Sequence, residues 1–312
     1  MKKKAIVIVG ATASGKTGLG VFVARKFNGE VISADSMQIY KGMSIATAKP
    51  TADEMQGIPH HLIDFLPVTE KYSVSSYCDD ARIVLDDIVN RGKTPVFVGG
   101  TGLYIDSFLS NTQFLENAGS EEVRERLKIE FEKHGIDKLY QELCDIDPET
   151  AKNIHPNNTV RVLRALEVYR ATGKTLSEQN ILSHSVESDV EPLYIAIGYR
   201  DREILYDRIN RRVDEMLASG LLDEAKAFFE MNPSVTAFKA IGCKELKPYL
   251  DGEADLDICV DNLKRETRRY AKRQLTWFKR NEKIHWIYAD DKDRDAVFKE
   301  AEVLVEKFLG GD

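Results

Sequence analysis

Gly10-Ala11-Thr12-Ala13-Ser14-Gly15-Lys16-Thr17 is the stretch that decides the fold of this chain. It matches the pattern G-x-x-x-x-G-K-[ST], with a β-branched run before it and an amphipathic segment after it. The two glycines permit a tight loop whose N–H groups converge on phosphate oxygens, and the following helix N-terminus adds partial positive charge. Lys16 supplies a point charge, and the Thr17 hydroxyl can contact a phosphate-bound Mg²⁺. The stretch therefore predicts a phosphate-binding loop.

Short β-branched runs elsewhere in the chain predict buried parallel strands. These runs are Ala5–Val9, Val31–Ala34, Pro95–Val98, Leu193–Ile197 and Ile284–Tyr288. Helical patterns such as Val74–Asn90 and Asp201–Ala218 separate them. Alternation of strands and helices predicts an α/β fold: a P-loop NTPase-like parallel sheet flanked by helices.

The region between Asn111 and Ser188 contains no run that predicts a strand. Helical patterns there cover Glu121–His134, Asp137–Cys144 and Asn158–Ala171, the last with Asn158 as N-cap and Gly173 beyond its end. The polar segment Ser183–Glu191 is expected to be a return linker. We therefore predict an all-helical insertion domain, residues 113–189, within a core made of residues 1–112 and 190–312.

The overall composition is that of a globular protein with ordinary charge content. The 312 residues carry a formal net charge of −7, so any basic surface for nucleic acid must be local. The four cysteines show no metal-binding or disulfide spacing, which favours a reducing, cytoplasmic location. No apolar stretch is long enough to span a membrane, and no long exposed apolar stripe calls for a partner subunit, so a monomer is expected.

Two features at strand ends indicate what the loop binds. The run Pro95–Val98 is followed by glycines and Thr101 instead of the aspartate with which nucleotide-hydrolysing enzymes hold Mg²⁺. The phosphate ligand is therefore not expected to be a hydrolysed nucleotide. Asp35 follows the run Val31–Ala34 at the sheet edge where ligands bind, and it could be a general base, a magnesium ligand or a helix cap.

A basic segment lies near the end of the chain. Residues 264–280 contain eight basic side chains and one acidic side chain, a local charge of +7. On a helix they form two i, i+4 stripes, Lys264/Arg268/Lys272 and Arg265/Arg269/Arg273, whose mutual repulsion a polyanion would relieve. The alternative is a solvated basic helix. Of Tyr270, Trp277 and Phe278, we expect two to pack in the core and not on bases.

Several motifs, in this order, resemble those of the bacterial tRNA dimethylallyltransferases, the tRNA isopentenyltransferase family. They are GATASGKT, ADSMQIYKGMSIATAKP, GIPHHLIDF, YSVSSY, GGTGLY, HPNNTVRVLRALEVY, FKAIGCKEL and TRRYAKRQLTWFKR. The resemblance implies transfer of a dimethylallyl group from dimethylallyl diphosphate to N6 of adenosine 37, in tRNAs that read codons starting with U. It also implies that the P-loop, with Mg²⁺, holds the donor's diphosphate and that ATP is not consumed.

The resemblance assigns roles to particular residues. It implies that Asp35 is the catalytic base and that Thr101 lies near the reacting centre. An arginine should complete the diphosphate clamp, for which we choose Arg208, with Arg211 and Arg212 as alternatives. The residues expected to contact the tRNA anticodon stem-loop are Asp35, Ser36, Met37, Gln38, Thr101, Arg161, Arg164, Arg268, Arg269, Lys272 and Arg273.

Some residues depart from the family pattern, and two other functions compete. Ala11, Val160 and Cys243 replace residues that are common in the family. The replacements at Val160 and Cys243 weaken the expectation that these two positions contact tRNA. The adjacent His60 and His61 are expected to be structural, because no further His or Cys ligand lies nearby in the sequence.

A small-molecule kinase would share the loop but would need neither Asp35 nor the basic helix. A non-catalytic RNA-binding protein would not need Lys16, Thr17 and Asp35 intact.

Overall fold

The computed structural model describes residues 2–114, 121–183 and 187–310. The chain divides into two compact units. Residues 1–109 and 189–312 form the core unit, and residues 110–188 form the second. Each unit is described below by itself.

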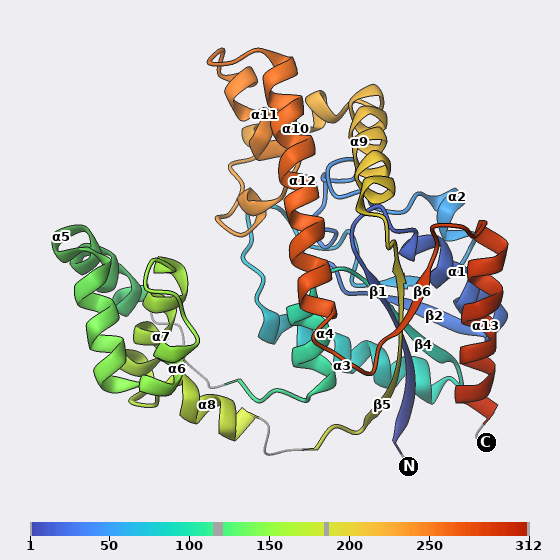
Figure 1. The fold of residues 1–312 in the computed structure, drawn as a ribbon, viewed down its shortest axis with the longest axis horizontal. Helices are drawn as coiled ribbons and strands as arrows, with labels where there is room; N and C mark the ends of the chain where they lie inside the picture. The colour runs from blue at the N-terminus through green and yellow to red at the C-terminus, as the bar shows by residue number, and fades with distance from the viewer. Residues whose placement is uncertain (1, 115–120, 184–186, 311–312) are drawn as a thin grey trace. The chain divides into compact units, whose positions relative to one another are not determined.

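The core unit is built on a six-stranded parallel sheet in the order β3-β2-β4-β1-β5-β6 (Figure 1). The strands are β1 (Lys3–Gly10), β2 (Gly29–Ser33), β3 (His60–His61), β4 (Thr94–Val98), β5 (Val190–Gly198) and β6 (His285–Tyr288). All five predicted strands are confirmed. The sixth, β3, was missed because two residues carry no alternating pattern.

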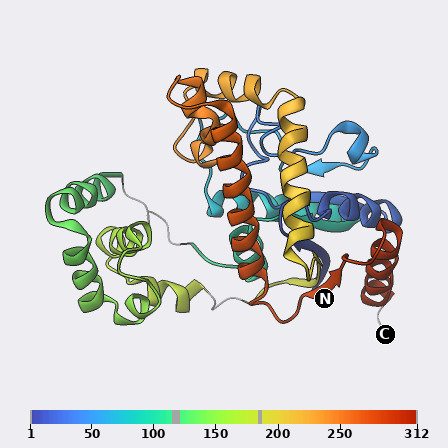
Figure 2. The same ribbon diagram turned by 45° about the horizontal axis from the view of Figure 1, so that its top comes forward.

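Helices cover both faces of this sheet and extend from the edge where its strands end (Figures 1 and 2). They are α1 (Lys16–Lys26), α2 (Ala52–Met55), α3 (Val74–Asn90), α4 (Gly102–Leu109), α9 (Arg202–Ala218), α10 (Leu221–Glu230), the 3₁₀ helix η1 (Ala237–Lys239), α11 (Cys243–Leu250), α12 (Leu256–Phe278) and α13 (Arg294–Gly310). The predicted helix Val74–Asn90 is confirmed at both ends. Helices α9 and α12 lie side by side beyond the carboxyl edge of the sheet.

The alternation of side chains along β1 explains the layers. Ala5, Val7 and Val9 point to the face covered by α3 and α4. Ile6 and Ile8 point to the other face, where α1 and α13 pack. A strand that is buried on both faces reads as a continuous apolar run, which is why β1 was recognisable from its sequence.

The second unit is helical throughout the residues that the structure describes. Its helices are α5 (Glu121–Ile146), α6 (Pro148–Lys152), α7 (Thr159–Thr172) and α8 (Leu176–Ser183). Helix α5 is interrupted at Gly135, with a φ of 75°, where two separate helices were predicted. Asn158 caps α7 by accepting from the N–H of Arg161, and Gly173 ends it, both as predicted.

The predicted linker Ser183–Glu191 was partly wrong. Strand β5 begins at Val190, which pairs with Lys3, so the last two residues of the segment belong to the sheet. Burial of Val190 beside β1 explains the difference. Residues 184–186 lie outside the described part of the chain. No helix within the described residues is both long enough and apolar enough to cross a lipid bilayer.

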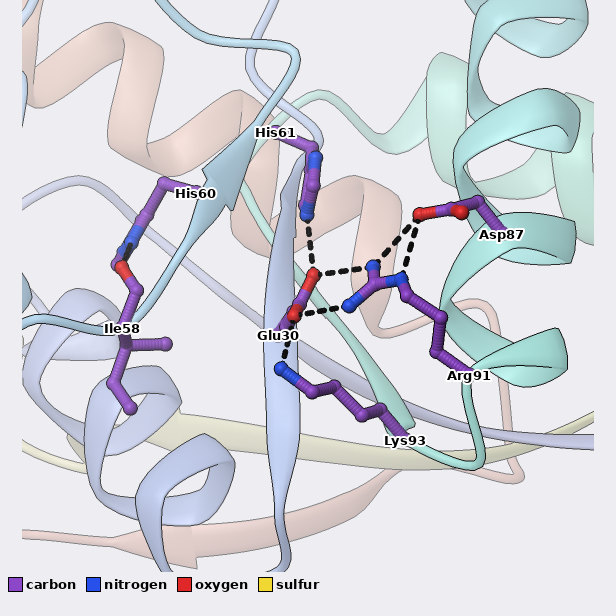
Figure 3. A network of polar contacts seen from close by, with 7 residues as sticks. All are labelled: Glu30, Ile58, His60, His61, Asp87, Arg91 and Lys93. Carbon is purple, nitrogen blue, oxygen red and sulfur yellow. Dashed lines mark hydrogen bonds and ion pairs between the residues drawn. The ribbon is translucent and has the colours of Figure 1, made fainter.

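A buried carboxylate organises the edge of the sheet opposite the P-loop (Figure 3). Glu30 of β2 is 2% exposed, and Arg91 donates to both of its oxygens, at 2.6 and 2.8 Å. Lys93 and His61 also contact this carboxylate, His61 at 2.7 Å. These partners, Arg91 first, hold the pKa of Glu30 well below its usual range. His61 thus takes part in a structural network, as its sequence context led us to expect.

We predict that Glu30→Gln lowers stability by about 2–4 kcal/mol at pH 7, since hydrogen bonds to charged groups and buried ion pairs are costly to break. The folded-state pKa of Glu30 is depressed, so its stabilisation is complete above the unfolded value of about 4.3 and is lost as pH falls below it. The urea midpoints of the two proteins should therefore draw closer from pH 7 to pH 3 without meeting, because pH 3 still lies above the depressed pKa of Glu30. Glu132→Gln, at an exposed position, is the control, and a gap independent of pH would contradict the prediction.

Candidate active site

The loop Gly10–Thr17 joins the end of β1 to the first turn of α1. Gly10 and Gly15 have φ angles of 144° and 101°, which strain residues that carry a side chain. A Cβ on Gly10 would also lie 3.0 Å from the carbonyl oxygen of Ile197. The chain thus turns directly into α1, whose first-turn N–H groups have no partner within the helix. This is the geometry with which such loops bind phosphate.

Lys16 lies inside this loop without an ion-pair partner among the described residues. Its Nζ donates to the carbonyl oxygen of Ala11 at 2.8 Å. Burial lowers the pKa of Lys16 to about 8, against the influence of Asp35, while Arg212 lowers it further. Burial deprives an ammonium group of solvation. An anionic ligand replaces that lost stabilisation with its own negative charge, so such a group binds an anion favourably.

The order of the strands brings three loops together. Because β4 lies between β1 and β2, the loop that begins at Gly99 runs between the P-loop and the turn at Asp35. Thr101 N donates to the carbonyl oxygen of Ala34. Its hydroxyl accepts from Ser36 N at 3.0 Å. The structure thus places Thr101 against the turn that follows β2.

Asp35 begins this turn. Its Oδ1 accepts from the backbone N–H groups of Met37 and Gln38, at 2.9 and 3.3 Å. Residues 36–39 form a turn and no helix begins there, so the helix cap that the sequence left as one alternative is wrong, and Asp35 stabilises a turn instead. The two hydrogen bonds also fix the orientation of the carboxylate, which lines a cavity shared with Lys16.

The identity of Gly99 and Gly100 is explained by close packing. A Cβ on Gly99 would lie 2.1 Å from the carbonyl oxygen of Ala34, and a Cβ on Gly100 would lie 2.1 Å from the side-chain nitrogen of Gln274. Both distances are far below van der Waals contact. Glycine here allows β4 to hold its two neighbouring loops at close range.

Two cavities meet at the P-loop. The first has a volume of about 250 Å³ and the second about 690 Å³. Polar residues that line the first include Lys16, Asp35, Ser36, Gln38, Tyr270 and Arg273, and Met37 also lines it. Apolar residues that line it include Ile209, Val213, Met216 and Leu263. Lys16, Thr17 and Arg212 line both cavities.

Three arginines of α9 line the second cavity: Arg208, Arg211 and Arg212. Arg208 donates through Nε to the carbonyl oxygen of Ala13 at 2.9 Å, so it holds the backbone of the P-loop. Only Arg212 lines the first cavity as well. Burial lowers the pKa of Arg212, and the negative charges of Glu54 and Asp35 partly oppose this shift. Its position between the cavities makes Arg212 a better placed clamp residue than Arg208, the choice made from the sequence.

Long-range contacts hold the segment Ser44–Ala48, part of which lines the first cavity. Glu224 of α10 accepts from the backbone N–H groups of Ser44, Ile45 and Ala46, all at 2.8 Å. The side-chain nitrogen of Gln38 donates to the carbonyl oxygens of Thr47 and Ala48, both at 3.1 Å. Sequence reasoning missed Glu224, because a lone glutamate on an amphipathic helix gives no signal for a contact 180 residues away.

The basic stripes of α12 are only partly exposed. Lys264 pairs with Asp214 at 2.6 Å, and Arg268 donates to Asn210 at 2.6 Å, so this stripe packs against α9. Asp214 offsets the charge of Lys264, whereas the neutral amide of Asn210 does not offset that of Arg268, so the contact of Arg268 with a polyanion stays a prediction. Exposed basic residues farther along α12 are Arg269, Lys272 and Arg273. Phe278 is buried and Trp277 half-buried, whereas Tyr270 lines the first cavity.

The remaining predicted contacts lie elsewhere. Arg161 and Arg164 are exposed near the start of α7, in the second unit, and Val160 precedes them with 76% exposure. Cys243 is fully buried in an apolar cluster, so its side chain packs and does not reach a ligand. Within the described residues, no three His, Cys, Asp or Glu side chains gather into a metal site.

Comparisons with known proteins agree with this geometry. The family model described as IPP transferase matches residues 38–281. A tRNA dimethylallyltransferase of Thermoanaerobacter sp. (strain X514) is 46% identical over 98% of this chain and 97% of its own. The enzyme of that name from Bacillus subtilis (strain 168) is 47% identical over 92% and 91%.

Solved structures show the same likeness. The tRNA isopentenylpyrophosphate transferase of Bacillus halodurans has a TM-score of 0.74 at 41% identity, covering 99% of this chain and 97% of that one. A eukaryotic dimethylallyltransferase described as acting on tRNA has a TM-score of 0.83 at 33% identity, covering 99% and 80%. The chain therefore belongs to the IPP transferase family, and its fold is the P-loop-like α/β fold predicted from the sequence.

We predict that Glu224→Ala loosens the segment Ser44–Ala48 while the rest of the fold persists. Each hydrogen bond to a charged group contributes about 1.5–3 kcal/mol, so amide hydrogen exchange at Ser44, Ile45 and Ala46 should accelerate about 10- to 100-fold. Glu230→Ala, the same change at an exposed position of α10, should leave this exchange unaltered. Unchanged protection in Glu224→Ala would show that the three contacts do not hold the segment.

Proposed function

We propose that this member of the IPP transferase family moves a dimethylallyl group from dimethylallyl diphosphate to N6 of adenosine 37 in tRNAs reading codons that start with U. The products are diphosphate and N6-dimethylallyladenosine. One observation carries the proposal: Lys16, Thr17 and Arg212 line both the large cavity over the P-loop and the smaller cavity that contains Asp35. The names of the relatives support the same reaction.

The P-loop would bind the leaving group. Its N–H groups, with Lys16 and Arg212, would stabilise the charge that builds up on the diphosphate as the C–O bond breaks. Both side chains are desolvated, and burial lowers the pKa of each. A bound diphosphate would hold Lys16 in its charged form, and Arg212 is charged with or without a ligand. Preorganised charges of this kind need no rearrangement during the reaction.

Asp35 would remove the proton of the attacking amine. Its Oδ1 is held by two backbone N–H groups, which leaves the other carboxylate oxygen to accept a proton from N6. As the N6–carbon bond forms, the bond between that carbon and the diphosphate oxygen breaks, and the proton passes to Asp35. Thr101, bonded to Ser36 at 3.0 Å, would help to place the base.

The donor's five-carbon chain requires an apolar surface in the same space. Ile209 and Val213 of α9, together with Leu263 of α12, line the cavity that contains Asp35. These side chains would exclude water from the allylic carbon and so favour attack by the amine over hydrolysis.

The residues present fit a magnesium ion held with the diphosphate. Mg²⁺ is usually bound by one or two protein oxygens, phosphate oxygens and waters, and it does not require a cluster of carboxylates. The Thr17 hydroxyl, which lines both cavities, would be the protein ligand. When bound, the ion would neutralise charge on the leaving diphosphate.

Basic residues on both units would hold the tRNA. Arg269, Lys272 and Arg273 of α12 are exposed and suited to phosphates of the anticodon stem-loop. Arg161 and Arg164 of the helical insertion would contact the same arm. The target adenine would leave its stack, as enzymes acting on bases generally require. Ser36, Met37 and Gln38, which line the cavity with Asp35, would contact its edge.

The decisive assay supplies radiolabelled dimethylallyl diphosphate and unmodified tRNA to the purified protein. We expect label in the tRNA at adenosine 37 and release of diphosphate without ATP. Turnover of ATP with no label in tRNA would instead identify a kinase.

We predict that Asp35→Asn reduces kcat about 10²- to 10⁴-fold, the usual contribution of a general base. Asparagine keeps an oxygen for the N–H groups of Met37 and Gln38, so the turn should persist. The Kd for tRNA, from filter binding, should stay within about threefold. Loss of binding in parallel with activity would make Asp35 an RNA ligand and not the base.

We also predict that chelation of divalent metal abolishes transfer and that added Mg²⁺ restores it. Thr17→Ala removes the proposed protein ligand. This variant should therefore need about tenfold more Mg²⁺ for half-maximal activity. Thr276→Ala, at an exposed position of α12, serves as control. Full activity of the wild-type protein in excess chelator would contradict the metal's role.

A further inference from the structure

Gln274 of α12 joins the P-loop to the loop that follows β4. Its side chain is 5% exposed. Its Oε1 accepts from Thr12 N at 2.9 Å, and its Nε2 donates to the carbonyl oxygen of Gly100 at 3.0 Å. A carboxamide suits this place because it offers an acceptor and a donor from one planar group. Both bonds connect segments far apart in the sequence.

The two backbone groups that Gln274 binds are parts of the catalytic edge. Thr12 lies in the first half of the P-loop, so its N–H is committed to α12 and not to a phosphate. A Cβ at Gly100 would lie 2.1 Å from the Gln274 nitrogen, so the glutamine side chain can occupy this position only because residue 100 is glycine. The next residue is Thr101, which contacts the turn of Asp35 through Ser36. Gln274 therefore touches both loops that flank the first cavity.

The neighbouring turns of α12 continue this contact. Tyr270, one turn earlier, lines the first cavity together with Gln274. Trp277, three residues later, donates to Asp106 of α4 at 2.7 Å. Exposed basic residues such as Arg269 and Lys272 occupy other positions on the same helix. One helix thus carries both the basic surface and the contact to the reacting groups.

We propose that Gln274 is a positioning residue for prenyl transfer: it fixes the distance between the diphosphate bound by the P-loop and the loop that carries Thr101. The inference rests on the function proposed above. Reacting atoms must approach to about 3–3.5 Å, and a displacement of about 1 Å can cost about 100-fold in rate. Because the electrophilic carbon is attached to the diphosphate, a shift of the P-loop relative to the Thr101 loop acts directly on this approach.

Two substitutions test the proposal. Gln274→Met keeps the length of the side chain and removes both hydrogen bonds, so kcat should fall about 10- to 100-fold while KM for tRNA stays within about threefold. Gln274→Glu should be equally impaired at pH 8, because its carboxylate faces the carbonyl oxygen of Gly100. When protonated, it can donate to that oxygen as glutamine does.

Activity of Gln274→Glu relative to wild type should therefore rise at least about fivefold from pH 8 to pH 6, given the raised pKa of a buried carboxyl. The titratable and charged groups that line the same cavity are Lys16, Asp35, Arg212, Lys239, Lys244, Tyr270 and Arg273. The wild-type profile measured in parallel accounts for their own titration. A merely structural loss would not recover on acidification. A flat ratio would overturn the assigned hydrogen bonds.

Phe278→Leu is the matched control, since it changes a buried residue of the same helix that does not line either cavity. With similar thermal destabilisation, it should keep kcat within about threefold. If it loses as much kcat as Gln274→Met, general loosening of α12 explains the effect and the proposal is wrong.

Binding of inorganic diphosphate separates this inference from the proposed function. Calorimetry should show about tenfold weaker binding to Gln274→Met than to wild type, because the P-loop is no longer fixed at Thr12. This measurement needs no transfer activity, so it holds even if wild type fails to label tRNA. Unchanged diphosphate affinity together with unchanged kcat would overturn the role of Gln274.

Discussion

The active edge of this protein depends on the insertion of β4 between β1 and β2. This order makes the loop at Gly99 the neighbour of both the P-loop and the turn at Asp35. The three loops come so close that a single methyl group at Gly99 would reach 2.1 Å from the carbonyl oxygen of Ala34. The phosphate-binding residues and the carboxylate therefore share one cavity because of strand order and glycine packing, before any side chain chemistry is considered.

The two ends of the sheet in the core unit differ in how their buried charges are paired. Glu30, at the opposite end of β2, has its charge matched by Arg91 and Lys93 and is also hydrogen-bonded to His61. At the P-loop end, Lys16 and Arg212 are desolvated, and burial lowers the pKa of both. The buried charge at the Glu30 end is thus paired within the protein. At the P-loop end, an anionic ligand would stabilise the buried cations. This contrast explains how a chain of net charge −7 can present a strong anion site.

Local signals account for what could be predicted from the sequence. Five of the six strands, the P-loop and the cap at Asn158 each depend on a few consecutive residues, and these were found, whereas the two-residue strand β3 was not. The contacts that shape the cavity were not predictable, because they join distant segments. Gln274 and Thr12 are 262 residues apart, and Glu224 and Ser44 are 180 apart. The contacts of Lys264 and Arg268 with α9 were likewise not foreseen, because Asp214 and Asn210 come from another part of the sequence.

The pairing of β1 also has a consequence for synthesis of the chain. Its partners β4 and β5 follow it by long intervals, as the pairs Ile6–Val96 and Lys3–Val190 show. At about 5–20 residues per second, the ribosome delivers the second partner roughly 10–40 s after β1 has emerged. β4 can cover one edge of this almost wholly apolar strand early, but the edge that pairs with β5 stays open while the helical insertion is translated. The growing polypeptide therefore depends on protection of its first ten residues from aggregation until β5 arrives.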